Sequence, residues 1–248
     1  MRKLDSAWEL LFEKYSIREQ VEENGFYDIR ASDFKEFNFE PRLLTKIDHS
    51  HQMPLVMKDC DLSILTLSNS SWRIGPFDIF CELPAWQQPD SSIVHKTLPN
   101  WLESLASDAI TGEGALINAA DASGIITDFV DDEVIPTVNG KGRSGSFDFT
   151  ISDHTKKQMR IPVSGAQIEV DAGFEGHNAL YLLEAKKHMS IDFNVRQLYY
   201  PFRTWNQRVK KQVRPIFVTL ANDVFDLTEF EFEDPDDFSS ISQVSHRR

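Results

Sequence analysis

The chain has 248 residues, 41% of them apolar, and a formal net charge of −13. This length can bury a sizeable core as one large domain or two small ones, but no apolar run approaches the roughly 18 residues that span a bilayer. Cys60 and Cys81 have no CxxC spacing, which argues against a disulfide framework and a cysteine zinc site. Because the first residues are too charged for a signal-peptide core, we expect a cytoplasmic protein without membrane contact.

The charge is unevenly distributed along the chain. Residues 135–214 hold 13 Lys/Arg against 7 Asp/Glu, so the rest holds 13 of the 26 basic and 32 of the 39 acidic residues. A phosphate-binding surface needs a local positive field and not a basic protein as a whole. Residues 135–214 can therefore contain such a surface, although a solvated charged face gives the same count.

The first part of the chain is predicted to contain one helix followed by strands. Asp5 or Ser6 caps a helix that runs to about Glu23 and is closed by Gly25. Residues 26–84 alternate short apolar runs with turn residues, which is typical of strands, and the clearest runs are Leu62–Leu67 and Trp72–Phe80.

A change in composition separates this part from a second unit. Residues 84–99 contain three Pro, two Gln, two Ser and Asp90 and are interpreted as a linker, which divides the chain into residues 1–99 and 100–248. In the second unit the apolar spacing predicts helices at 101–106 and 111–130, the latter interrupted at Gly124. Further along we expect strands at 146–151, 158–163, 167–172 and 179–185, a helix at 194–210 and a strand at 214–220.

The two strands at 167–172 and 179–185 carry acidic residues in a distinctive pattern. Glu169 and Asp171 alternate with apolar residues on the first strand, and Glu184 and Lys186 share one face of the second. If residues 174–178 join the strands as a hairpin, Asp171 and Glu184 converge, with Lys186 beside them. Two carboxylates can hold a hard divalent cation, and an adjacent ammonium can orient or deprotonate a water.

The order of elements and this motif resemble the PD-(D/E)xK nuclease superfamily. The order is a helix, a meander of strands with carboxylates, another helix and another strand. The motif stands here as Val170-Asp171 and, after twelve further residues, Glu184-Ala185-Lys186. Valine replaces the proline of the family name, a departure that many members share.

Longer segments resemble one group within this superfamily, the type II restriction endonucleases. They are residues 167–175, residues 196–205 and, in the N-terminal half, residues 40–48. The resemblance implies an α/β (α+β) fold, with a central mixed β-sheet flanked by helices as a restriction-endonuclease-like core. A smaller mixed N-terminal region, residues 1–99, would then take part in DNA recognition.

The resemblance also implies an activity and its partners. It predicts a Mg²⁺-dependent endonuclease, with Mn²⁺ as a substitute, that hydrolyses double-stranded DNA at a specific sequence. A cut in both strands usually needs two active sites, so a homodimer is expected, and such an enzyme acts beside a cognate DNA methyltransferase. Lys186 would hold or deprotonate the attacking water and offset charge on the phosphate.

The predicted site residues fall into three groups. The catalytic group comprises Asp171, Glu184, Lys186 and Glu113, which begins the helix before the hairpin. The metal ligands are Asp171, Glu184, the carbonyl of Ala185 and Glu169. The DNA-binding residues are Arg143, Ser144, Ser146, Lys187, Arg196, Gln197, Tyr200 and Arg203.

Two alternative functions fit the same sequence. The first keeps the nuclease fold but changes the substrate to branched or repair DNA, or to RNA. The second is a non-enzymatic acidic protein that mimics DNA or binds a basic partner, which the acidic stretch at residues 229–237 favours.

Overall fold

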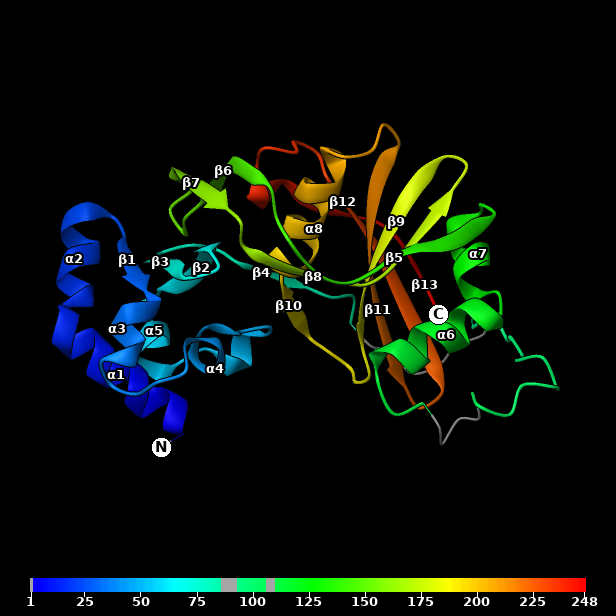
Figure 1. The fold of residues 1–248 in the computed structure, drawn as a ribbon, viewed down its shortest axis with the longest axis horizontal. Helices are drawn as coiled ribbons and strands as arrows, with labels where there is room; N and C mark the ends of the chain where they lie inside the picture. The colour runs from blue at the N-terminus through cyan, green and yellow to red at the C-terminus, as the bar shows by residue number, and fades with distance from the viewer. Residues whose placement is uncertain (1, 86–92, 106–109) are drawn as a thin grey trace.

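A computed structural model describes residues 2–85, 93–105 and 110–248. Within these ranges the strands form a six-stranded mixed sheet, a three-stranded sheet and two two-stranded sheets. Figure 1 shows the three-stranded sheet and its helices at one end of the molecule and the six-stranded sheet at the other. None of the helices in the described ranges combines the length and apolar character that a membrane crossing requires.

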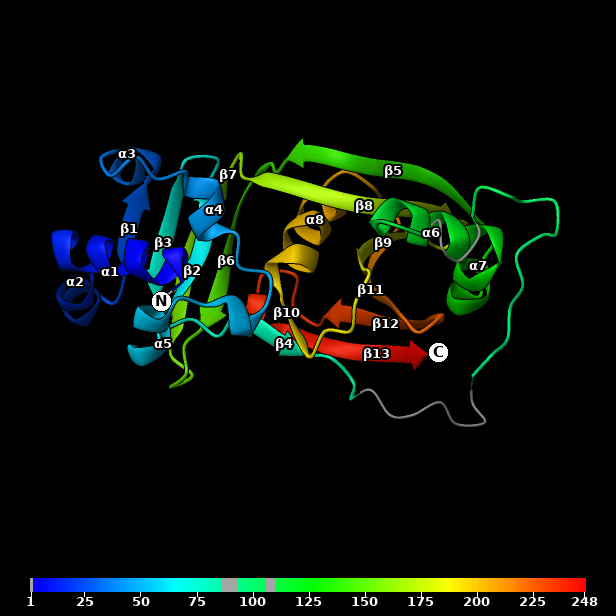
Figure 2. The same cartoon turned by 90° about the horizontal axis from the view of Figure 1, so that it is seen from below.

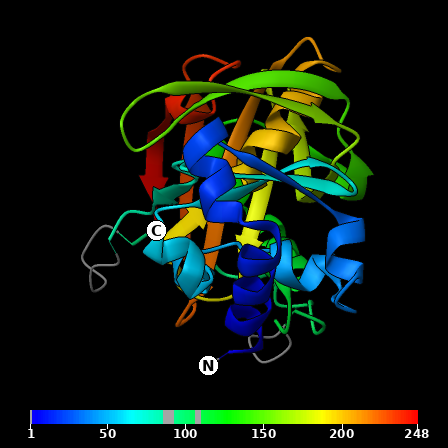
Figure 3. The same cartoon turned by 90° about the vertical axis from the view of Figure 1, so that its left-hand side faces the viewer.

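The N-terminal unit packs short helices around the small antiparallel sheet β1-β3-β2, and Figure 3 shows it end-on in front of the large sheet. Trp8 and Phe34 form an edge-to-face pair at 5.6 Å, and Phe34 and Trp72 another at 5.5 Å, so these aromatic rings centre its core. Its elements are α1 Lys3–Tyr15, α2 Ile17–Asn24, β1 Tyr27–Arg30, α3 Ala31–Lys35, α4 Pro41–Thr45, η1 Ser50–Gln52, α5 Leu55–Asp59, β2 Ser63–Ser68 and β3 Ser71–Gly75.

Two expectations for this unit need correction. The single predicted helix is broken at Ser16, whose φ of 46° separates α1 from α2, although Gly25 ends the pair as expected with φ of 82°. Residues 31–59 form short helices rather than strands, because Pro41 at the first turn of α4 and Pro54 at the N-cap of α5 favour helix starts. The strand at 62–67 is confirmed as β2, whereas 72–80 is divided between β3 and β4.

The second unit is built on the six-stranded sheet, in the order β13-β12-β11-β9-β8-β5. Strands β9 and β11 are parallel and the other neighbours are antiparallel, so the predicted mixed sheet flanked by helices is confirmed. The elements are β4 Phe80–Glu82, α6 Glu113–Ala122, α7 Ile125–Val130, β5 Val134–Arg143, β6 Ser146–Ser152, β7 Gln158–Ser164, β8 Gln167–Gly176, β9 Ala179–Lys186, β10 Asp192–Asn194, α8 Arg196–Asn206, β11 Gln212–Ala221, β12 Val224–Phe232, η3 Phe238–Ser240 and β13 Ile241–Arg247.

Helices cover both faces of this sheet (Figure 2). Leu180 and Leu182 of β9 pack into a core cluster with α8, whereas Tyr181 and Leu183 pack into a second cluster with α6 and α7. The strict alternation along β9 is the pattern of a strand buried on both faces. It directs Glu184 and Lys186, which follow Leu182, to the face that carries α8.

The other predicted elements of this unit are confirmed in part. The strands at 146–151, 158–163, 167–172, 179–185 and 214–220 and the helix after the hairpin are present, and Gly124 (φ 73°) separates α6 from α7. Residues 101–105 form turns rather than the predicted helix, and Ala106 lies outside the described residues. Of the predicted linker, residues 93–99 have no helix or strand, and residues 86–92 lie outside the described ranges.

A β-bulge in β8 determines the face of the sheet on which Asp171 lies. Val170 packs in the cluster with α8 but Ala172 packs in the opposite cluster, and the pairing of β8 with β5 shifts register between Val138 and Gly140. A β-bulge switches the face that a strand presents. Because Ala172 opposes Leu183 on β9, Asp171 lies on the face of Glu184.

Gly173 at this bulge has no room for a side chain. A Cβ there would lie 2.7 Å from Val138 Cβ and 3.1 Å from Leu182 Cδ2. We expect Gly173→Ala to lower the free energy of unfolding by about 1–3 kcal/mol through overpacking, measured by denaturant unfolding. Gly142→Ala on β5 is the control, because its Cβ would be 3.7 Å from its nearest neighbour, Ile168. Equal stability of the two variants would contradict tight packing at the bulge.

Candidate active site

A cleft of about 640 Å³ lies between the N-terminal unit and the large sheet. The sheet side contributes the hairpin carboxylates and the start of α8, and the N-terminal side contributes α3, α4 and the turn between β2 and β3. The lining residues with charged side chains are Lys35, Glu40, Arg42, Lys46, Asp48, Glu113, Lys141, Glu169, Asp171, Glu184, Lys186 and Arg196. The predicted catalytic residues therefore share one cleft.

Asp171 and Glu184 are held in place by the ends of the hairpin strands. The backbone N–H of Ala185 donates a hydrogen bond of 2.9 Å to Asp171 Oδ2, so the carboxylate of β8 is tied to β9 beside Glu184. Glu184 is 8% exposed, and its Oε1 accepts a hydrogen bond of 2.5 Å from Gln197 Nε2 on α8. Both carboxylates are thus oriented by neighbouring strands and helix before any ligand binds.

Lys186 is the cation of this group and is also 8% exposed. Its ammonium forms an ion pair with Glu184 Oε1 and lies 3.5 Å from Glu113 Oε1 at the start of α6. Glu113 is nearly half exposed, so it can move toward a ligand in the cleft. The structure brings together the four predicted catalytic residues Asp171, Glu184, Lys186 and Glu113.

Burial and neighbouring charges perturb the titration of these groups. Desolvation raises the pKa of Glu184 to about 7 and, to a smaller extent, raises the pKa of Asp171. Burial lowers the pKa of Lys186, but the charges of Glu184, Glu113 and Asp171 outweigh it and raise the pKa above its ordinary value. Lys186 is therefore charged at neutral pH. Its positive charge does not fully offset the burial of the two carboxylates, so the pKa values of Asp171 and Glu184 stay raised.

These residues fit a divalent cation in the chemistry of their donors. Among the described residues there is no group of three or more His, Cys, Asp or Glu side chains that is already arranged as a metal site. Asp171 and Glu184 nevertheless supply two oxygen donors of the kind that Mg²⁺ prefers, since this ion retains several waters and needs few protein ligands. The Oε1 atom of Gln197 is buried without a hydrogen-bond partner, which adds a further unused oxygen next to Glu184.

Comparison with known proteins shows the family to which the chain belongs. Residues 75–248, which include every carboxylate of the β8–β9 hairpin, match the model of a domain of unknown function (DUF6997). The chain belongs to the DUF6997 family. Residues 5–74 match a second domain of unknown function (DUF6996), and no curated protein or solved structure matches the chain. The two family models meet at residues 74 and 75, and the division at residue 99 stays a prediction.

The DUF6996 and DUF6997 segments are joined beside the cleft by buried hydrogen bonds. Asn194 donates from its side chain to Ile47 O (2.9 Å) and from its backbone to Asp48 O (2.8 Å). His49 Nδ1 lies 2.6 Å from Asp192 O, and Tyr200 on α8 donates to Thr66 O on β2 (2.6 Å). These bonds fix α4 and β2 relative to the hairpin carboxylates.

The DNA-binding residues predicted within the DUF6997 segment lie in several places. Arg196, Gln197 and Tyr200 line the cleft, and Lys187 is exposed directly after Lys186. Arg143 is exposed at the end of β5, outside the cleft lining. Glu169, a predicted metal ligand, is about half exposed at the cleft with Lys141 Nζ 3.7 Å away.

Two predicted DNA contacts, Ser144 and Ser146, form hydrogen bonds with other residues of the protein and do not line the cleft. Ser144 is 6% exposed, and its hydroxyl accepts from the backbone N–H of Ala166 and donates to Gly145 O. The hydroxyl of Ser146 lies 2.9 Å from that of Ser164 across the β6–β7 pair. Ser144 lies between β5 and β6 and Ser146 on β6, and their predicted role in DNA binding stays a prediction.

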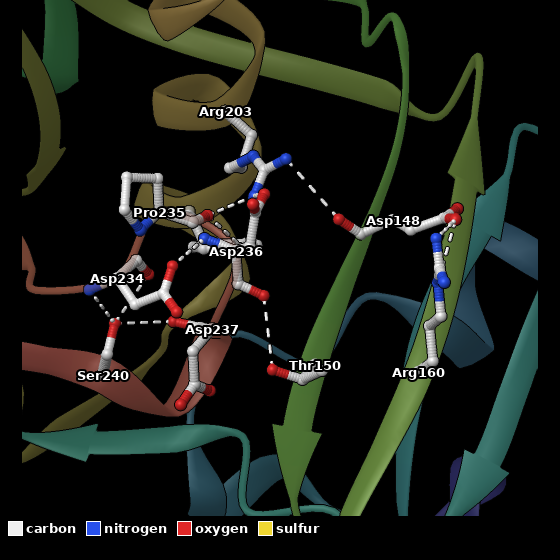
Figure 4. Close-up of polar contacts among 10 residues, drawn as sticks. Asp148, Thr150, Arg160, Arg203, Asp234, Pro235, Asp236, Asp237 and Ser240 are labelled. Atoms are coloured by element: carbon white, nitrogen blue, oxygen red, sulfur yellow. Dashed lines mark hydrogen bonds and ion pairs between the residues drawn. The ribbon is translucent and has the colours of Figure 1, made fainter.

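Arg203 is buried and does not line the cleft. Figure 4 shows its guanidinium directed from α8 toward Pro235 and Asp236. It is 7% exposed, forms an ion pair with Asp236 and donates to the carbonyl of Pro235. Arg203 therefore has structural contacts with the segment that follows β12, and its predicted contact with DNA stays a prediction.

The two arginines of α8 should respond differently to mutation. We expect Arg203→Ala to lower the free energy of unfolding by about 1–3 kcal/mol, since charge-assisted bonds and a buried side chain are lost. Arg196→Ala should change it by less than about 0.5 kcal/mol, because among the described residues Arg196 has no ion pair. Urea denaturation of both variants measures this contrast, and a larger loss for Arg196→Ala would reverse the assignment.

The N-terminal wall of the cleft was not predicted residue by residue. It contributes Lys35, Arg42, Lys46 and Asn69, and the sheet side adds Lys141. The resemblance of residues 40–48 to restriction endonucleases was the one signal in the sequence that pointed to this wall. Lys35 and Asn69 lie outside that segment and had no such signal.

Proposed function

We propose that the chain is a Mg²⁺-dependent nuclease that hydrolyses phosphodiester bonds of double-stranded DNA at a specific sequence. The observation that carries this proposal is the convergence of Asp171, Glu184 and Lys186 in one cleft. The order of elements supports it, because helix α6, the strands β5, β8 and β9, helix α8 and strand β11 follow one another as the PD-(D/E)xK resemblance implies.

Asp171 and Glu184, with the carbonyl of Ala185, would hold the metal ion. A bound Mg²⁺ or Mn²⁺ would polarise the scissile phosphate and lower the pKa of a water molecule. The buried position of Glu184 and its bond from Gln197 keep the carboxylate oriented, and this pre-organisation reduces the reorganisation that metal binding needs.

Lys186 supplies positive charge at the same place. Its raised pKa and its contacts with Glu184 and Glu113 favour a charged hydrogen-bond donor over a general base. In this role it holds the attacking water and stabilises the negative charge that develops on the phosphate in the transition state. Cleavage of both strands would use two such sites, one from each protomer of a homodimer, and a cognate methyltransferase would protect the host DNA.

The test is incubation of the purified chain with plasmid or phage DNA, with Mg²⁺ and with EDTA. Discrete fragments that require Mg²⁺ support the proposal, and sequencing of their ends identifies the recognition site. Cleavage of branched DNA or RNA, with intact plasmid, would retain the nuclease chemistry and replace the substrate. Intact nucleic acid in every reaction would contradict the proposal.

A further inference from the structure

Three cations in the cleft have no acidic partner. Lys35 on α3, Arg42 on α4 and Arg196 at the start of α8 line the cleft, and within the described residues none of them forms an ion pair. The other three basic residues of the lining are paired: Lys46 with Asp48, Lys141 with Glu169 and Lys186 with Glu184. The cleft therefore has two kinds of cation, of which only the second forms ion pairs within the described residues.

The unpaired cations are notable in a chain with 39 acidic and 26 basic residues. Lys35 and Arg42 belong to the N-terminal unit, whereas Arg196 comes from the large sheet side, so the two walls direct positive charge into the same space. Arg196 also stands in the first turn of α8, where a cation is disfavoured by the helix dipole. An anionic ligand in the cleft would offset this cost.

The turn between β2 and β3 adds neutral hydrogen-bonding groups to the same wall. Asn69 is exposed at this turn and lines the cleft. The turn is anchored, because the backbone N–H of Ala31 donates to Ser70 O (2.9 Å) at the start of α3. In the major groove an arginine can form bidentate hydrogen bonds with guanine, and an asparagine can form them with adenine.

The wall is held at a fixed position relative to the carboxylates. Tyr200 is one turn along α8 from Arg196 and donates to Thr66 O on β2, three residues before Asn69. Asn194 binds the carbonyls of Ile47 and Asp48, directly after α4. A nuclease that cuts at a fixed place in its recognition sequence needs such a constant separation between the residues that bind bases and those that cleave.

We propose that the N-terminal wall of the cleft determines the sequence specificity of this chain, with Arg42 and Asn69 as the residues that contact bases. Lys35 and Arg196 contact the DNA phosphates that flank these bases, and they contribute affinity without sequence specificity. The proposal rests on the proposed nuclease function, since it assigns the substrate contacts of that same cleft.

The experiment separates binding from cleavage. Binding of a fluorescein-labelled random-sequence DNA duplex is measured in EDTA by anisotropy, and cleavage of phage DNA in Mg²⁺ is followed by sequencing of the fragment ends. The variants are Arg42→Ala, Asn69→Ala and Lys35→Ala. Lys58→Ala is the charge-matched control, because Lys58 is exposed on α5 and does not line the cleft. Thermal unfolding of each variant shows that the fold is retained.

We expect Arg42→Ala and Asn69→Ala to cut additional sites that differ from the original site at one position each. Cleavage of the original site should fall by at least about five-fold, the loss of one bidentate base contact. Lys35→Ala should weaken binding of the random duplex and lower its salt dependence while leaving the cut sites unchanged. Lys58→Ala should match the original chain in both assays.

The outcomes distinguish the two proposals. If the chain cuts DNA at one sequence and Arg42→Ala and Asn69→Ala cut the same sites equally well, the specificity assignment is overturned and the nuclease function stands. If the chain binds the duplex through Arg42 and Lys35 but never cuts it, the assignment of the wall as a DNA-binding surface stands and the nuclease function falls. If it neither binds nor cuts DNA, both fall.

Discussion

Glu184→Gln should abolish Mg²⁺-dependent cleavage, with a loss of about 10³-fold or more in rate. The substitution keeps the size of the side chain but removes a buried negative charge that would hold the metal ion and that pairs with Lys186. Fragment formation from plasmid DNA, followed over time in Mg²⁺, measures the loss. Binding of DNA in EDTA should remain, since the unpaired cations of the cleft are unchanged.

The matched control for this variant lies in the same hairpin. Glu175→Gln changes a carboxylate of β8 that is partly exposed, pairs with Lys211 (2.8 Å) and does not line the cleft. Such a surface pair contributes little to stability, so this variant should cut DNA at the original rate. Full activity of Glu184→Gln, or equal loss in both variants, would remove Glu184 from the catalytic centre.

The β8–β9 hairpin with its carboxylates could be predicted because its signals are local. Apolar and acidic residues alternate in the first strand, and Glu184 and Lys186 share one face of the second. The polar turn between the strands limited the possible register of their pairing to a narrow range. The structure confirms that Asp171, Glu184 and Lys186 meet. The bulge between Val170 and Ala172 could not be predicted from alternation alone, because it depends on the partner strand β5, which was missed.

Contacts between distant segments could not be derived from sequence patterns. Helix α8 was expected to expose its arginines, yet Arg203 is buried because the loop at residues 233–240 lies over it. Nothing in the spacing of α8 distinguishes Arg203 from Arg196. Which arginine faces the cleft is decided by segments that pack against the helix from more than thirty residues away.

The cleft itself is a product of such distant contacts. Asn194 and His49 are buried polar residues that join the two units, and single asparagine and histidine residues carry no pattern that predicts this role. The sequence located one wall of the site through its carboxylates. The opposite wall, with Arg42 and Asn69, is formed by α4 and the β2–β3 turn, which line the same cleft as the start of α8.

Mg²⁺ should stabilise the protein more strongly as the pH rises. Burial raises the pKa of Glu184 from 4.5 to about 7, so the folded state binds a proton more tightly than the unfolded state. Without metal, the contribution of the Glu184 carboxyl to the free energy of unfolding is therefore lost as the pH rises from about 4.5 through about 7. Mg²⁺ competes with that proton, because it binds only the carboxylate.

This prediction is tested by measuring the melting temperature with and without Mg²⁺ across this pH range. At about pH 5 the ion should raise the melting temperature little, whereas at about pH 8 a concentration of about 100 times the Kd should raise it by about 5–10 °C. Glu184→Gln should remove most of this pH dependence, and Glu175→Gln should preserve it. A Mg²⁺ effect of equal size at both pH values, or one that survives in Glu184→Gln, would mean that the ion binds elsewhere. Loss of the effect in Glu184→Gln alone would link the buried carboxylate to the metal without relying on any assay of DNA cleavage.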